Sequence, residues 1–132
     1  MKKFVQNFII KEKKHRALFE LQSPKKRGLF IDKLNHNIEG VFKVKLLQNI
    51  KNSSNPIYIK TALKLKKDEL CYVISHNNTL YNQIINYDYA INKLFGNGFG
   101  YCIMNLSANN IYVESEQGFG APDRYLGAFV QL

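Results

Sequence analysis

The sequence predicts an α+β fold with a mostly antiparallel sheet, elements in the order ααβββαβββ, and the helices packed on one face of the sheet. Apolar residues recur at helical spacing in the first 40 residues, whereas short alternating or continuous apolar segments follow from residue 41. A length of 132 residues and a hydrophobic content of 45% fit one domain with its own core. We therefore expect a single domain over 1–132, with a helical hairpin at 1–40 and a sheet-forming part at 41–132 that contains one helix.

Two helices are predicted before the first strand. The first covers residues 3–21, whose apolar side chains share one face. The charged run at 11–16 interrupts that face, so the helix is either exposed there or broken in two. Ser23 and Pro24 are a typical helix start, because serine is a favoured N-cap and proline is tolerated at the first helical position. The second helix is expected to end near Gly40.

A basic hairpin is predicted next. Residues 41–47 and 57–66 each alternate apolar and polar side chains, which is typical of strands. The intervening residues 48–56 contain asparagine, serine and proline and indicate a loop. Because side chains alternate across a strand, one face of this hairpin is apolar and the other carries lysines.

The second half of the chain supplies the remaining strands and one helix. Residues 70–75 are almost continuously apolar, which is typical of a central strand covered on both faces. A third helix is predicted to start at 77–79 and to be firm only over ~86–95, because the segment contains weak helix formers such as asparagine. Gly96 is expected to end it. Three further strands are predicted at 101–106, 111–116 and 125–130.

The charge is distributed unevenly along the chain. Lysine and arginine number 19 against 10 acidic residues, which gives a net charge of +9. The first 67 residues hold 17 of the basic and four of the acidic residues and carry +13, whereas the remainder carries −4. An AT-rich genome would raise the lysine content by itself, but such drift does not explain an acidic second half. The asymmetry favours a polyanion-binding surface on the first half.

Two basic segments are candidates for that surface. A helix starting at Ser23 would have three cations in its first turn, where the helix dipole disfavours positive charge but free N–H groups bind phosphate. Lysines on the polar face of the predicted hairpin would follow a phosphate backbone, with Tyr58 stacking on an unpaired base. Solvated basic faces are the alternative interpretation of both segments. The candidate residues are Lys13, Lys14, Arg16, Ser23, Lys25, Lys26, Arg27, Lys43, Lys45, Tyr58, Lys60, Lys64 and Lys66.

An enzyme is the alternative function. Glu114 and Glu116 point to the same face of their predicted strand, with Arg124 nearby, and two carboxylates can act as acid and base. A small nuclease or transferase of a bacterial conflict or toxin-type system would use these residues. A charged outer face is the other interpretation of the same pattern.

No cofactor or metal ion is expected. The glycines at 96–100 follow a predicted helix and precede a strand, which is the reverse of the order in a nucleotide-binding loop. The histidines stand in no metal-ligand pattern, although His76 could border a pocket at a strand end and His36, with the basic turn, could act as a general base. Cys71 and Cys102 each lie in an apolar run, so buried free thiols are expected.

These observations favour a small intracellular module that binds a polyanion, above all DNA or RNA, through its basic first half. No apolar run approaches the ~20 residues of a membrane helix, and the N-terminus lacks a signal-peptide cleavage site. We therefore expect a cytoplasmic location and no membrane partner. A protein-interaction module or an oligomer, in which the halves of opposite sign meet different partners or each other, is a further alternative.

Overall fold

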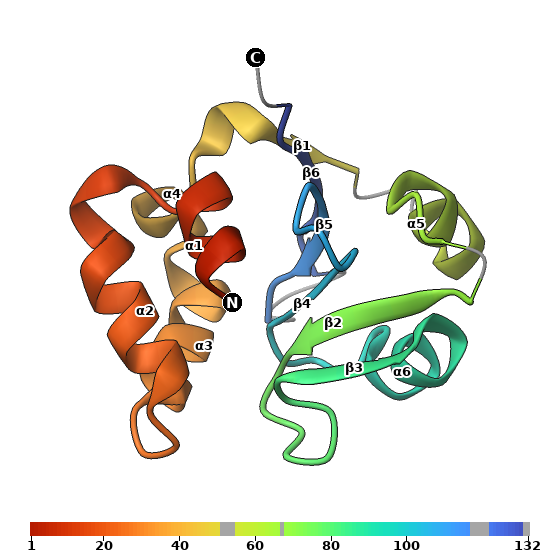
Figure 1. The fold of residues 1–132 in the computed structure, drawn as a ribbon, viewed down its shortest axis with the longest axis horizontal. Coiled ribbons are helices and arrows are strands. Elements are labelled where there is room, and N and C mark those ends of the chain that lie inside the picture. The colour runs from red at the N-terminus through yellow and green to blue at the C-terminus, as the bar shows by residue number, and fades with distance from the viewer. Residues whose placement is uncertain (51–54, 67, 117–121, 131–132) are drawn as a thin grey trace.

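A six-stranded antiparallel sheet lies between two layers of helices in the computed structural model, which describes residues 1–50, 55–66, 68–116 and 122–130 (Figure 1). The strands lie in the sheet in the order β1-β6-β5-β4-β2-β3. The α+β class and the antiparallel sheet are therefore as predicted. The strands are β1 (Leu47–Asn49), β2 (Leu70–Ile74), β3 (Gln83–Asn86), β4 (Tyr101–Met104), β5 (Asn110–Glu114) and β6 (Arg124–Ala128).

Helices cover both faces of this sheet, not one as predicted. One layer consists of α1 (Lys2–Phe8), α2 (Lys14–Gln22), α3 (Arg27–His36) and α4 (Ile38–Val41). The other layer, on the opposite face, consists of α5 (Pro56–Ala62) and α6 (Tyr87–Leu94) (Figure 1). The described residues after 41 thus contain two α-helices, besides a short 3₁₀ helix, where one helix was expected.

Strand β4 shows why both faces are covered. All four of its residues are buried. Cys102 and Met104 belong to the core beneath α1–α4, and Tyr101 and Ile103 belong to the core beneath α5 and α6, because successive side chains point to opposite faces. A strand that is apolar at every position has two faces to bury, and each needs its own layer.

The predicted strand at 57–66 is wrong, since α5 covers residues 57–62 and a turn follows at 63–64. The Asn55 side chain accepts a hydrogen bond from the Tyr58 backbone N–H (2.9 Å), and Pro56 follows at the first helical position. Ile59 and Leu63 are both buried and lie one helical turn apart. Apolar residues at every second position include pairs four residues apart, so the same pattern fits a helix and a strand. The Asn55 cap favours the helix.

The predicted hairpin is therefore absent from the described structure. Within 41–47, residues Val44–Leu46 form a short 3₁₀ helix, and β1 begins only at Leu47. Strand β1 pairs with β6 instead of with 57–66. Residues 51–54 of the predicted loop lie outside the described residues.

The two N-terminal helices also differ from their predicted bounds. The helix predicted at 3–21 breaks into α1 and α2 around a 3₁₀ helix at Lys11–Lys13, where the interrupting charged run is exposed. The next helix, α3, begins at Arg27 and not at Pro24. Ser23 makes no side-chain cap, and its carbonyl oxygen accepts from the Lys26 and Arg27 N–H groups (both 3.0 Å) in a tight turn.

The second half follows the prediction more closely. The apolar segment at 70–75 forms β2, an inner strand between β4 and β3. The firm part of the third helix is α6, whose N-cap Asn86 accepts from the Tyr89 N–H, and Gly96 follows it at φ +70°. The start predicted at 77–79 is wrong, because residues 78–82 form a turn and β3 follows at Gln83. Strands β4, β5 and β6 lie within the predicted ranges or extend them by one residue, and both cysteines are buried free thiols.

Gly127 in β6 allows α1 to pack closely on the sheet. A Cβ atom at this position would lie 2.8 Å from Leu47 Cδ2, 2.9 Å from Ile111 Cγ1 and 3.2 Å from Phe8 Cε1. Two of these atoms belong to neighbouring strands and the third to α1. The missing side chain therefore provides the space that the Phe8 ring uses.

We predict that Gly127→Ala lowers the free energy of unfolding by about 1–3 kcal/mol, because the added methyl group overpacks this contact. Gly28→Ala is the matched control: its Cβ would meet only His76 Cε1 at 3.8 Å, and alanine has a higher helix propensity than glycine at this second residue of α3. Urea unfolding of both variants measures the difference. Equal midpoints for Gly127→Ala and wild type would contradict the packing argument.

Candidate anion-binding site

The structure separates the predicted basic residues into three groups. Lys13 and Lys14 lie at the start of α2, near Lys43, whereas Lys25 and Lys26 follow its other end. Since α2 has nine residues, these two groups lie about 13 Å or more apart. The third group belongs to α5 and the loop after it, on the far side of the sheet (Figure 1): Tyr58, Lys60, Lys64 and Lys66.

Arg16 is held by a buried carboxylate within the helical layer. Its Nε atom lies 3.0 Å from Glu20 Oε2, and Lys33 Nζ lies 2.9 Å from Glu20 Oε1. Burial alone would raise the pKa of Glu20, but the hydrogen bonds from Lys33 and Arg16 bring it below its usual value. These contacts connect α2 to α3, and Arg16 and Lys33 share the one negative charge of Glu20.

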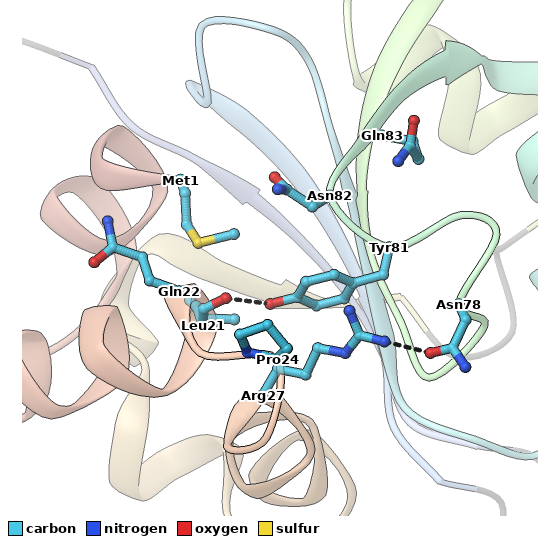
Figure 2. Close-up of a pocket in the computed structure, with 9 residues that line it drawn as sticks. All are labelled: Met1, Leu21, Gln22, Pro24, Arg27, Asn78, Tyr81, Asn82 and Gln83. Atoms are coloured by element: carbon cyan, nitrogen blue, oxygen red, sulfur yellow. Dashed lines mark hydrogen bonds between the residues drawn. The ribbon is translucent and has the colours of Figure 1, made fainter.

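Arg27 likewise has partners within the protein (Figure 2). Its guanidinium lies 4.4 Å from the centroid of the Tyr81 ring and donates a hydrogen bond to Asn78 Oδ1. The Tyr81 hydroxyl donates to the Leu21 carbonyl oxygen (2.6 Å). Together these contacts join the helical layer to the connection between β2 and β3, beside a pocket of about 480 Å³.

The helix start on which the expected anion site was based differs in the structure. Because α3 begins at Arg27, Lys25 and Lys26 lie in the preceding turn and not in the first helical turn. The N–H groups of Arg27 and Leu29 donate to the carbonyl oxygens of Ser23 and Lys26, so neither is free for a phosphate. Lys25 and Lys26 remain exposed at this turn.

The third group is partly neutralised as well. Lys60 Nζ lies 2.7 Å from Glu69 Oε2 and 3.3 Å from Asp88 Oδ2, and its hydrogen bonds with these carboxylates raise the pKa of Lys60. Lys64 and Lys66 are exposed in the loop that follows α5. The row of lysines expected on one strand face is therefore absent.

Three lysines from separate segments instead converge on one cleft of about 510 Å³, which we call the lysine cleft. Lys3 comes from α1, Lys14 begins α2, and Lys43 follows α4. Short backbone hydrogen bonds bring these segments together: the Lys43 N–H donates to the Phe8 carbonyl oxygen (2.8 Å). None of the described residues that line the cleft is acidic; they are Lys3, Gln6, Asn7, Lys14, Lys43, Asn109 and Phe129.

Lys43 shows the electrostatic character of the lysine cleft. Its Nζ atom donates to the Gln6 carbonyl oxygen (3.3 Å) and lies 5.8 Å from the centroid of the Phe129 ring. Burial lowers the pKa of Lys43, and the nearby charge of Lys14 lowers it further. Two ammonium groups that repel each other in a cleft without a carboxylate are a favourable site for an anion.

Sequence reasoning found two of these three lysines but not their proximity. Lys14 and Lys43 belonged to different predicted surfaces, and Lys3 was not a candidate. The antiparallel bridge between Ile9 and Phe42 brings their segments together. No local pattern marks that bridge, because the two residues are far apart in the sequence.

Glu114 lies in the core and not on an outer face. Its carboxylate is fully buried and accepts from the hydroxyls of Tyr112 (2.6 Å) and Tyr101 (2.9 Å) and from the Gly96 N–H (3.0 Å). Arg124 Nε completes the set at 3.2 Å. Burial, together with the nearby carboxylate, raises the pKa of Tyr101 and Tyr112. Both carboxylate oxygens are occupied, which is typical of a structural role.

Glu116 belongs to a different site, a second cleft of about 570 Å³ that it shares with Asp32, His36, His76 and Phe99. His36 Nε2 lies 3.5 Å from Glu116 Oε2, and His76 Nε2 lies 3.4 Å from Asp32 Oδ1. His76 thus borders a pocket at the end of β2. His36 ends α3, at the other end of the helix from the basic turn expected beside it. Within the described ranges, no group of three or more His, Cys, Asp or Glu residues could hold a metal ion.

Comparisons with protein-family models, curated proteins and solved structures found no match for this chain. No helix in the described part of the chain is long and apolar enough to cross a membrane. Function must therefore be inferred from the geometry of the clefts and surfaces.

We predict that Glu114→Gln lowers the free energy of unfolding by about 3 kcal/mol or more, because it leaves the partly buried Arg124 guanidinium without its counter-charge. Glu116→Gln is the matched control and should change stability by no more than about 0.5 kcal/mol, since that side chain is partly exposed. Urea unfolding at neutral pH measures both. Equal effects of the two substitutions would contradict a structural role for Glu114.

Proposed function

We propose that this protein binds a phosphate-bearing polyanion, above all DNA or RNA, through the lysine cleft. The observation that carries the proposal is the convergence of Lys3, Lys14 and Lys43 on one cleft with no acidic lining residue among those described. We propose a cytoplasmic location for this role, which needs no cofactor.

The chemistry of the lysine cleft suits phosphate better than bases. Lysine presents a compact charge on a flexible stem, which contacts phosphate oxygens but reads base edges poorly compared with arginine. Phosphate between Lys14 and Lys43 would relieve the repulsion of their ammonium groups. Affinity would come mainly from counterion release and would show little sequence preference.

Neighbouring lysines extend the same surface. Lys11 and Lys13 lie in the 3₁₀ helix that leads into Lys14, and Lys45 lies two residues after Lys43. All three are exposed. A polymer with regularly spaced phosphates could therefore contact several lysines beyond the cleft, which favours a nucleic acid over a single small anion.

The other predicted residues receive less weight in this proposal. Arg16, Arg27 and Lys60 are engaged with groups of the protein itself. Lys25 and Lys26 form a separate exposed pair at the far end of α2. The enzyme alternative has less support, because Glu114 is fully hydrogen-bonded within the core and Glu116 faces a different cleft.

We predict that Lys14→Gln/Lys43→Gln weakens binding of fluorescently labelled DNA and RNA at low salt. On duplex DNA, the slope of log affinity against log salt should flatten by about 0.9 for each phosphate that the variant no longer neutralises. Fluorescence anisotropy across a salt series measures both quantities. Lys64→Gln/Lys66→Gln is the matched control, because it removes the same charge from exposed lysines outside the cleft.

Two results would contradict the proposal. Equal weakening by the two double variants would show that only net charge matters. Absence of binding by the wild-type protein to DNA and to RNA at low salt would show that the lysine cleft is not a nucleic-acid site.

A further inference from the structure

The helical layer formed by α1–α4 leaves one end of its sheet face uncovered. A continuous row of residues runs across this face from one edge strand to the other: Leu47, Gly127, Ile111, Met104, Tyr72 and Ile84. Ile111 and Met104 in the middle are buried under the helices. Ile84 on β3 is 60% exposed. The row is apolar to its end, and its last member lies exposed in a groove that it shares with the start of α1.

Strand β3 is also an open edge. Only β2 pairs with it in the described structure, so its other side is available for backbone hydrogen bonds. Proteins commonly protect such edges with lysine, proline or a very short strand. The opposite edge, β1, has only three residues, whereas β3 has the sequence Gln-Ile-Ile-Asn without a charge or a proline. Strand β3, which has four residues, therefore lacks the lysine and the proline and is only one residue longer than β1.

A groove of about 490 Å³ lies beside this edge. Its apolar lining includes Tyr72, Ile84, Met104 and Leu106, and Leu106 is itself exposed. The Tyr72 hydroxyl is buried and is the one described buried side-chain polar atom with no hydrogen-bond partner.

The charge beside the groove identifies the kind of partner. Lys2 and Lys3 line it as well, both are exposed, and none of the described lining residues is acidic. A second copy of this chain, paired through β3, would bring two such lysine pairs to one face of a continuous sheet and add the repulsion of two basic molecules. An acidic partner meets no such repulsion.

We propose that β3 and its groove bind an extended segment of a partner protein that adds a strand beside β3. On the groove side, its apolar side chains would continue the row beyond Ile84, and a carboxylate between them would pair with Lys2 or Lys3. Backbone hydrogen bonds would supply affinity, and the alternate side chains would supply specificity. This site is separate from the proposed nucleic-acid function, although Lys3 lines both clefts.

The test is an NMR titration of the ¹⁵N-labelled full chain with the synthetic peptide Thr-Ile-Thr-Glu-Thr-Ile-Thr. Its isoleucines and glutamate share one face, as the groove requires. We expect saturable shifts centred on the amides of Gln83–Asn86. A peptide with lysine in place of glutamate should bind roughly tenfold more weakly, because it lacks the ion pair. A peptide with proline in place of the two inner threonines should bind roughly tenfold more weakly as well, because it lacks backbone hydrogen bonds.

Two variants of the protein make the result specific. Ile84→Lys should abolish the shifts, and its exposed position makes it tolerable for folding. Lys14→Gln/Lys43→Gln should bind the peptide as wild type does, so loss of nucleic-acid binding and loss of peptide binding are distinguishable. Absence of shifts, equal binding of the acidic and basic peptides, or shifts centred away from β3 would overturn the proposal. A wild-type dimer in sedimentation that Ile84→Lys dissociates would overturn it in favour of a second copy.

Discussion

Burial of β4 and β5 on both faces is the constraint on which the rest of the structure depends. Their side chains alternate between two apolar cores, so neither face of the sheet centre can meet water. One face takes the four helices of the N-terminal segment, and the other takes α5 and α6. In the described structure β1 and β3 form the two edges of the sheet, and the edges are unequal, because β1 has three residues and β3 has four and no charge.

Local pattern predicted those elements for which spacing and end signals agree. The apolar run that became β2 and the segment that became α6 each contain one consistent pattern, and both were found. The segment that became α5 contains two: Ile59 and Leu63 satisfy the helical spacing, while the alternation around them satisfies a strand. Its start at Asn55-Pro56 favours the helix, because the Asn55 side chain accepts a hydrogen bond from the Tyr58 N–H and so caps the first turn. In short segments of this kind, the residues at the ends predict the structure better than the apolar spacing does.

The candidate site was harder to predict, because its parts meet only through tertiary contacts. The lysine excess of the first half is visible in the sequence, but which lysines become neighbours depends on the pairing of residues 8–10 with 41–43. The burial of Glu114 could not be predicted for the same reason. Its burial depends on Tyr101 from β4 and on the Gly96 N–H after α6, neither of which its own strand reveals.

The contact between Asn7 and Ala108 has a consequence for how the chain folds. The Asn7 side-chain amide donates to the Ala108 carbonyl oxygen (3.0 Å) across 101 residues of sequence. The N-terminal helices therefore leave the ribosome long before the hairpin of β4 and β5 on which they pack. Until then their apolar faces have no sheet to cover, and α1, with only seven residues, is too short to be stable alone. Contacts of such long sequence separation are typical of slow-folding domains. Because α1–α4 are synthesised before the strands that they cover, their apolar faces stay exposed until those strands follow.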